Sequence, residues 1–403
     1  MEMKWQNRGH EFDEKAVYWC SVKTIFIYGL SDLAKELGAM LTFTNIDKDI
    51  KIVFVDSDIQ KQQSGYKNYP VISLPDLLGM IASNGGMNWY VIVDCTYESS
   101  VSMLLQCYEK ICVGENLFSF GLFIKSFLPV VLWYRFGKAF CPSAAIHFST
   151  HCNLKCVGCG VFTERYYPKQ DRALEDVYKD IDILFNKFDY IWHAGTCGGE
   201  PFLYRQLPEL LRYASKYAHK VFSFGNVTNG TISASPAIVA AYEEFNTKSP
   251  YANVSGGGTL VIDDYSESVP FSRLEAIYAE FRRHGIHVQT QRYANWVDFR
   301  VMKANHINLQ DEALTAFHDI CNNSCWWLCD GRFYTCGMTL SASHAGFLID
   351  EPNNSIDLYT CTIPEFLEFQ AGYTQKGFFE LCKHCDGYVT INRNHIGVAI
   401  QSS

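Results

Sequence analysis

Short apolar runs alternate with helical patterns along the first third of the chain. Four of these runs end in a turn or an acidic residue and predict strands at residues 24–29, 50–56, 70–74 and 89–94. The first elements follow the order of one half of a Rossmann-like fold: a strand, a glycine turn, a helix and a second strand that ends in an acidic residue. The turn sequence Gly29-Leu-Ser-Asp-Leu-Ala does not match GxGxxG. A nucleotide-binding domain and a plain α/β domain therefore stay open as alternatives.

A second alternating series begins near residue 145. Its apolar runs predict strands at residues 146–149, 190–195, 220–225, 259–263 and 287–291. Helical periodicity between them predicts helices at residues 174–188, 207–216, 236–245 and 272–284. Four or five strand–helix units in this alternation predict an α/β fold with an open or partial parallel barrel. Catalytic groups of such folds lie at the C-terminal ends of the strands.

The two series divide the chain into four predicted parts. These are a Rossmann-like α/β domain at 1–115, a linker at 116–142, the partial barrel at 143–305 and a small cysteine-rich domain at 306–403. The most apolar stretch, residues 117–136, is interrupted by Gly121, Lys125 and Pro129. A membrane span needs about 20 mostly apolar residues with few charges, so we predict a buried or interdomain helix here and no membrane span.

Composition narrows the class of protein. The 403 residues are 48% hydrophobic and carry a formal net charge of −9, which predicts large cores and argues against nucleic acid as the main partner. The first residues are charged and show no apolar signal segment, so we expect a cytoplasmic protein. Thiols stay reduced in that compartment, and the 16 cysteines therefore indicate metal binding more than disulfides.

Three cysteines form a CxxxCxxC motif directly after the first barrel strand. Cys152, Cys156 and Cys159 are close enough on one loop to hold three irons of a 4Fe–4S cluster. A fourth local cysteine is missing, so one iron would keep an open position, as a catalytic metal centre requires. Two alternatives stay open: a zinc knuckle, for which only His151 offers a fourth ligand, and three unrelated thiols.

On these cysteines and a following segment, the sequence resembles the radical S-adenosylmethionine (SAM) superfamily over about residues 143–305. The resemblance implies that the α/β series forms a partial (β/α)6 TIM-like barrel. The segment is Gly198, Gly199, Glu200 and Pro201, at the end of the second barrel strand. The resemblance implies that it holds the amino group of SAM against the open iron. The chemistry agrees, because glycines let a ligand approach the backbone and a carboxylate pairs with an ammonium.

Further polar positions match at the ends of later strands. Thr228 and Asn229 follow the third strand, where the resemblance implies SAM contacts, and Asp263 follows the fourth, where a polar side chain often meets the ribose. Gly158 departs from the family pattern, in which an aromatic often precedes the third cysteine, and Phe162 is expected to supply that packing.

The resemblance also implies the reaction. A reduced cluster passes one electron to SAM, and the resulting 5′-deoxyadenosyl radical takes a hydrogen atom from the substrate. The electron would come from a donor protein such as flavodoxin or ferredoxin.

The last hundred residues resemble a twitch or SPASM extension, which carries an auxiliary 4Fe–4S cluster. An Asp-Gly turn, a hairpin signal, stands at residues 330–331 among these cysteines. We predict four ligands: Cys325, Cys336, Cys382 and Cys385. Cys321 and Cys329 compete for the same places, Cys361 is a weaker candidate, and structural zinc is the alternative metal.

Cys197, just before the glycines, is either a thiol that donates hydrogen to a substrate radical or a small buried residue. The N-terminal domain is similar to those that precede sugar-modifying enzymes, so we expect dehydrogenation or epimerisation of a sugar or sugar-nucleotide. The substrate would then be a small molecule. A peptide maturase is the alternative enzyme, and a zinc-stapled binding protein is the alternative outside enzymes.

Overall fold

The computed structural model describes residues 5–84, 89–95, 116–165, 169–322 and 325–402. The chain forms two compact units. One comprises Gly9–Ala139, and the other comprises Phe140–Ser403 together with Met1–Arg8.

The first unit contains a parallel five-stranded sheet in the order β3-β2-β1-β4-β5. Its strands are β1 (Thr24–Tyr28), β2 (Lys51–Val55), β3 (Val71–Ile72), β4 (Tyr90–Asp94) and β5 (Leu117–Ser119). Its helices are α1 (Asp13–Trp19), α2 (Asp32–Phe43), η1 (Ile46–Lys48), α3 (Ile59–Ser64), α4 (Leu74–Asn84), α6 (Phe120–Leu122), η2 (Phe123–Phe127) and α7 (Leu128–Phe136). The order is that of a Rossmann-like fold, with its topological switch point between β1 and β4.

Residues 116–142, which we expected to be a linker, are instead built into both units. β5 pairs with β4, and a helical stretch from α6 to α7 follows at once. The apolar side chains that suggested a buried helix are buried here, with Phe123, Phe127 and Leu128 fully enclosed. In the described residues, no helix combines the length and the apolar character needed to cross a bilayer.

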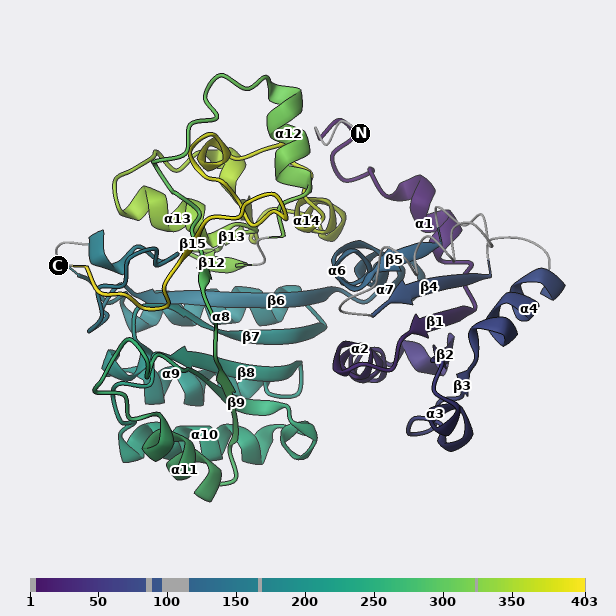
Figure 1. Ribbon diagram of the computed structural model, residues 1–403, viewed down its shortest axis with the longest axis horizontal. Coiled ribbons are helices and arrows are strands. Elements are labelled where there is room, and N and C mark those ends of the chain that lie inside the picture. The colour runs from purple at the N-terminus through teal and green to yellow at the C-terminus, as the bar shows by residue number, and fades with distance from the viewer. Residues whose placement is uncertain (1–4, 85–88, 96–115, 166–168, 323–324, 403) are drawn as a thin grey trace. The chain divides into compact units, whose positions relative to one another are not determined.

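The second unit is organised around an open eight-stranded sheet in the order β10-β9-β8-β7-β6-β12-β13-β14. The first five strands of this order run parallel and follow the chain in reverse: β6 (Phe140–Ser149), β7 (Tyr190–Gly198), β8 (Val221–Thr228), β9 (Gly257–Asp263) and β10 (His287–Gln291). Each predicted strand overlaps one of these five, and β10 agrees exactly in its bounds, but β6 begins six residues before the predicted strand at 146–149. The fold is the expected α/β partial barrel. Figure 1 shows β6 to β9 side by side.

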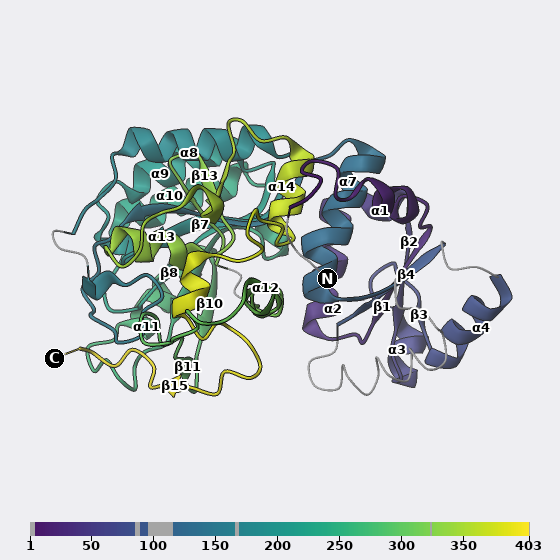
Figure 2. The ribbon, with the colours of Figure 1, turned by 90° about the horizontal axis from the view of Figure 1, so that it is seen from above.

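Helices connect these strands in the predicted alternation. They are α8 (Leu174–Lys187), α9 (Leu207–Ala214), α10 (Pro236–Lys248) and α11 (Leu274–Arg283), with short turns η3 (Thr163–Arg165), η4 (Pro201–Leu203), η5 (Ser215–Tyr217) and η6 (Ala252–Val254). Helix α8 shows why they form: its buried residues Val177, Ile181, Leu184 and Phe185 recur at helical spacing and pack on one face. Figure 2 shows helices α8 to α11 from above.

The sixth parallel strand comes from the cysteine-rich region and not from the βα series. β12 (Trp327–Cys329) pairs parallel to β6, and β13 (Arg332–Tyr334) and β14 (Ile356–Asp357) extend the sheet antiparallel. β11 (Trp296–Val297) pairs instead with β15 (His395–Ile396). The remaining helices are α12 (Asp311–Asp319), α13 (Gly337–His344), η7 (Pro352–Asn354), α14 (Ile363–Gln370) and η8 (Glu380–His384).

Candidate active site

One cavity, at the C-terminal ends of β6 to β9, brings together most of the residues predicted to hold the first cluster and SAM. It encloses about 800 Å³ of empty space, including solvent at its mouth, within the size range of small-molecule sites. Its lining includes the three cysteines of the motif, Gly198, Gly199, Glu200, Thr228, Asn229 and Asp263. Residues separated by more than a hundred positions therefore face one space, as the parallel topology requires.

The three motif cysteines lie on an irregular loop after β6. Cys156 is 6% exposed, and Cys152 and Cys159 are partly exposed toward the cavity. Burial raises the pKa of Cys152, and it raises the pKa of Cys156 to about 12. A bound metal would overcome this cost, since a coordinated thiol is deprotonated outright.

The donor set fits an iron–sulfur cluster. The cavity lining offers the three thiols of Cys152, Cys156 and Cys159, and cysteine thiolates are the ligands that hold 4Fe–4S clusters.

The two glycines at the end of β7 permit a close backbone approach. A Cβ at Gly198 would lie 2.1 Å from the carbonyl oxygen of Ser149, and one at Gly199 would lie 1.7 Å from that of His151. The Gly199 N–H donates to the Ser149 carbonyl at 2.8 Å, and the Glu200 N–H donates to the His151 carbonyl at 2.7 Å. The absence of side chains at these glycines thus lets the end of β7 pack directly on the backbone at the start of the cluster loop. We had predicted the glycines as SAM contacts and had not predicted this structural role.

Glu200 is held in place before any ligand binds. Its carboxylate accepts the Thr228 hydroxyl at 2.7 Å, the Asn229 N–H at 2.9 Å and the Phe202 N–H at 3.1 Å. Burial raises the pKa of Glu200 to about 7 despite these bonds, and the nearby Asp263 adds to the rise. A ligand group that donates hydrogen bonds or carries positive charge would stabilise the ionised form.

Asp263 offers a second buried acceptor to the cavity. Tyr265 donates to its Oδ2 at 2.7 Å, while its Oδ1 is buried with no hydrogen-bond partner in the part of the chain that the structure describes. Burial raises the pKa of Asp263 to about 6. Tyr265 packs edge-to-face on Trp296 with ring centroids 5.6 Å apart, and both rings line the cavity.

Asn229 and Thr228 point in different directions from the end of β8. The Asn229 Nδ2 donates to Asn153 Oδ1 at 3.0 Å and contacts Cys152 Sγ at 3.7 Å, so it supports the cluster loop. Thr228 is fully buried and its hydroxyl is used by Glu200. Pro201 begins the η4 turn directly after Glu200.

A family model described as the radical SAM superfamily matches residues 146–295. This match spans the cysteine loop, the glycine segment and all of β7 to β10. The chain therefore contains a radical SAM domain. It is a radical SAM enzyme with an α/β partial barrel.

Solved structures similar to this radical SAM enzyme include three proteins bound to AdoMet. BtrN in complex with AdoMet and 2-DOIA is 14% identical, with a TM-score of 0.40 over 63% of this chain and 96% of its own. Native anSMEcpe with AdoMet is 12% identical, with a TM-score of 0.37, and the match covers 59% of this chain and 82% of anSMEcpe. SuiB of Streptococcus suis with S-adenosylmethionine is 17% identical, with a TM-score of 0.30, and the match covers 42% of this chain and 36% of SuiB. No curated protein matches the chain.

The C-terminal cysteines separate into one group and two outliers. Burial raises the pKa of Cys336, and the neighbouring thiols that raise it further are Cys382, Cys385, Cys321 and Cys325. Cys321 Sγ accepts the Tyr388 N–H at 3.3 Å, and Cys385 Sγ accepts the Gly387 N–H at 3.3 Å. Cys325 is the exposed member of the group. Five thiols therefore lie near one another, one more than the four that we had predicted as ligands.

The two outliers lie among charged groups elsewhere. Cys329 is placed by Arg172 and Asp330, and its thiol donates to Asp330 Oδ2 at 3.7 Å. Cys361 lies beside Lys187, whose ammonium also donates to the carbonyl of Cys361. Both thiols stand apart from the group around Cys336.

Of the two remaining predicted residues, Cys197 lines the cavity and Phe162 does not. Cys197 lines the cavity, and its thiol donates to the Ala145 carbonyl at 3.3 Å while it packs against Trp327 and Cys329. Phe162 lines a different pocket, where it packs on Met338 and Phe347, and it is not among the residues that line the cavity. A left-handed backbone at Phe162, with φ of 55°, accompanies that packing.

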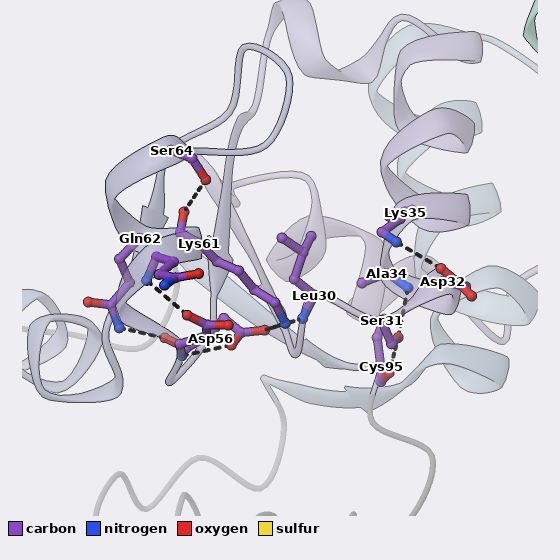
Figure 3. A network of polar contacts seen from close by, with 12 residues as sticks. Leu30, Ser31, Asp32, Ala34, Lys35, Asp56, Lys61, Gln62, Ser64 and Cys95 are labelled. Carbon is purple, nitrogen blue, oxygen red and sulfur yellow. Dashed lines mark hydrogen bonds and ion pairs between the residues drawn. The ribbon is translucent and has the colours of Figure 1, made fainter.

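In the N-terminal unit, Asp56 after β2 is the acid of the Rossmann-like pattern. Figure 3 shows that its carboxylate accepts the Leu30 N–H at 2.9 Å, the Asp58 N–H at 2.9 Å and the Lys61 ammonium at 3.0 Å. Burial alone would raise the pKa of Asp56, but these bonds bring it below the ordinary value. The acid thus braces the glycine turn, which favours a structural role for it.

Trp296 and residues 395–402 complete the surroundings of the cluster loop. Trp296 contacts Tyr265 and lines the cavity. Residues 395–402 lie against the loop about 240 positions from it. No motif marks this segment, so the sequence offers no signal from which it can be found.

Proposed function

We propose that this radical SAM enzyme binds SAM in the cavity at the ends of β6 to β9. The observation that carries the proposal is the convergence there of three thiols, a pre-positioned carboxylate and a buried unpartnered carboxylate oxygen. When bound, a reduced 4Fe–4S cluster supplies the electron that splits SAM into methionine and a 5′-deoxyadenosyl radical, which abstracts a substrate hydrogen.

The chain's own residues have distinct tasks in this proposal. Cys152, Cys156 and Cys159 ligate three irons and leave the fourth open to SAM. Glu200, already fixed by Thr228 and Asn229, accepts hydrogen bonds from the SAM amino group. These interactions hold the ligand in one orientation, so that little entropy is lost at the reactive step.

Asp263 is proposed to accept a ribose hydroxyl on Oδ1, for which no hydrogen-bond partner stands within range among the described residues, although Tyr293 also acts on this carboxylate. The rings of Tyr265 and Trp296 line the cavity near Asp263 and shield it from water. Cys197 reaches the same space, and its thiol is the side chain we propose as a hydrogen donor if the substrate radical is quenched.

A second 4Fe–4S cluster is proposed for the group around Cys336. All four predicted ligands, Cys325, Cys336, Cys382 and Cys385, belong to this group, and Cys321 is its fifth member. Cys321 is favoured over Cys325 as the fourth ligand, because a backbone N–H is already directed at its sulfur and because Cys325 is exposed. Backbone donors to sulfur stabilise ligating thiolates.

The proposed substrate is a sugar or sugar-nucleotide that is dehydrogenated or epimerised. The support is the Rossmann-like strand order of the N-terminal unit, which is not the strand-adding winged-helix unit expected of a peptide maturase. A reduced flavodoxin or ferredoxin is proposed as the electron donor.

Anaerobic incubation of the reconstituted protein with SAM and dithionite tests the function. We expect 5′-deoxyadenosine, and a Glu200→Gln variant should form much less of it at limiting SAM. A screen of deuterated sugar-nucleotides and peptides then tests the substrate class: deuterium should enter 5′-deoxyadenosine from a sugar. Transfer from peptides alone would reject the sugar proposal, and no 5′-deoxyadenosine from an iron-loaded protein would reject the function.

A further inference from the structure

The segment at residues 395–402 supplies hydrogen bonds that the cluster loop cannot make by itself. After β15, the chain runs antiparallel to the loop, and Gln401 forms a bridge with Cys156. The Val157 N–H donates to the Ile400 carbonyl at 2.7 Å, and the Ser402 N–H donates to the Lys155 carbonyl at 2.8 Å. Cys156 is thus held between two backbone hydrogen bonds.

The side chain of Gln401 adds contacts to the same loop. Its Oε1 accepts the Lys155 N–H at 2.7 Å, and its Nε2 donates to Cys156 Sγ at 3.3 Å. Nε2 also donates to the Ala399 carbonyl at 2.7 Å, which fixes the orientation of the amide. Ala399 is completely buried and packs against Cys156 and Leu154.

These contacts reach the sulfur that would carry an iron. Hydrogen bonds to cluster sulfurs are among the factors that set the reduction potential of iron–sulfur clusters. A donor stabilises the reduced state more than the oxidised state, because the reduced cluster carries one more negative charge. The donor therefore raises the potential and makes the cluster easier to reduce.

We infer that residues 395–402 are a positioning element for the cluster loop, in which Gln401 donates to the Cys156 thiolate and raises the reduction potential of the SAM-binding cluster. This inference rests on the proposed cluster at Cys152, Cys156 and Cys159. Gln401 is a positioning residue, since it acts through Cys156 and not on SAM or substrate.

Two substitutions separate the donor from the other contacts. Gln401→Glu keeps the side-chain length and the oxygen that accepts from Lys155, but it removes the donor and places negative charge near the sulfur. Gln401→Met removes the donor without adding charge. Ser402→Ala is the matched control, because the Ser402 bond to Lys155 uses the backbone N–H, which alanine retains.

The measurement is an anaerobic redox titration of the full-length reconstituted protein, followed by the electron paramagnetic resonance signal of the reduced cluster at Cys152, Cys156 and Cys159. That signal is identified by its change on addition of SAM. At a fixed poise we expect Gln401→Glu to lower the ratio of reduced to oxidised cluster at least about threefold. For a one-electron couple this is a shift of about 28 mV at 59 mV per tenfold. Gln401→Met should shift less in the same direction, and Ser402→Ala should match wild type.

The outcomes separate this inference from the function on which it rests. Wild-type protein that forms 5′-deoxyadenosine, with Gln401→Glu at an unchanged potential and full iron content, would overturn the role of Gln401 alone. Wild-type protein that holds no SAM-binding cluster would overturn both. A variant that loses iron as well as potential supports the positioning role, provided that its unfolding temperature equals that of Ser402→Ala.

Discussion

Replacing Glu200 with glutamine should weaken SAM binding about 10- to 150-fold. The Glu200 side chain is 2% exposed and its carboxylate accepts three hydrogen bonds, so it is in position before the ligand arrives. Glutamine keeps the shape and removes the charge. A hydrogen bond to a charged group contributes about 1.5–3 kcal/mol, and about 1.36 kcal/mol corresponds to a tenfold change, which gives the expected range.

The pH dependence follows from the raised pKa of Glu200. Because burial brings this pKa to about 7, the ionised fraction grows between pH 6 and pH 7.5, and wild-type affinity for SAM should rise with it. Stability changes in the opposite direction. Between about pH 4.5 and 7 the folded state holds a proton that the unfolded state has released, so this carboxyl's contribution to the free energy of unfolding falls as pH rises. The loss is roughly 3 kcal/mol.

Anaerobic calorimetric titration with SAM at pH 6 and pH 7.5 measures the effect. Glu209→Gln, an exposed position on α9, is the matched control and should bind as wild type does. The Glu200→Gln variant should show a smaller increase in affinity with pH than wild type. Equal affinity of Glu200→Gln and wild type, at equal iron content, would refute the role given to the carboxylate.

Three other substitutions test separate parts of the structure. Gly199→Ala places a Cβ 1.7 Å from the His151 carbonyl oxygen, so the cluster loop has to move. The variant should hold less iron than wild type after reconstitution. An iron content equal to that of wild type would contradict the close contact between Gly199 and the loop. Cys321→Ser should reduce iron from about eight to about four per chain, as expected for two cubanes, while Cys361→Ser should leave it unchanged. Asp180 is fully buried, and its carboxylate accepts hydrogen bonds from the Arg172 side chain and from the backbone N–H groups of the hairpin turn at Asp330 and Gly331. Asp180→Asn should therefore lower the free energy of unfolding by about 3–5 kcal/mol in chemical denaturation. A change below about 1 kcal/mol would show that these hydrogen bonds contribute little to stability.

Much of the barrel was predictable because its signals are local. The run at Tyr190–Gly198 is a strand that ends in the glycine segment, as its apolar pattern indicates, and α8 follows its helical spacing within a residue. The parallel topology then brings Glu200 and Asp263 to one edge, so a prediction from strand order reaches the cavity without knowledge of tertiary contacts.

The parts that escaped prediction depend on long-range pairing. β12 completes the parallel strands beside β6, although the sequence places it far outside the βα series. The orientation of Phe162 is decided by Met338 and Phe347, which no local pattern connects to it. Nor does the spacing of the C-terminal cysteines show which thiols meet, because their loops close around Cys336 only in three dimensions.

These long-range pairings also explain why the barrel and the cysteine-rich region form one compact unit. Without residues 306–403, β6 would lose its β12 neighbour, and the hairpin turn at Asp330 would no longer occupy the buried Asp180 carboxylate. The cluster loop would lose its bonds to residues 399–402 in the same step. An unpaired strand edge and a buried carboxylate without its donors are both unfavourable. The region that carries the proposed second cluster therefore also supports the fold around the first, and a fragment ending at residue 305 is expected to bind its cluster poorly.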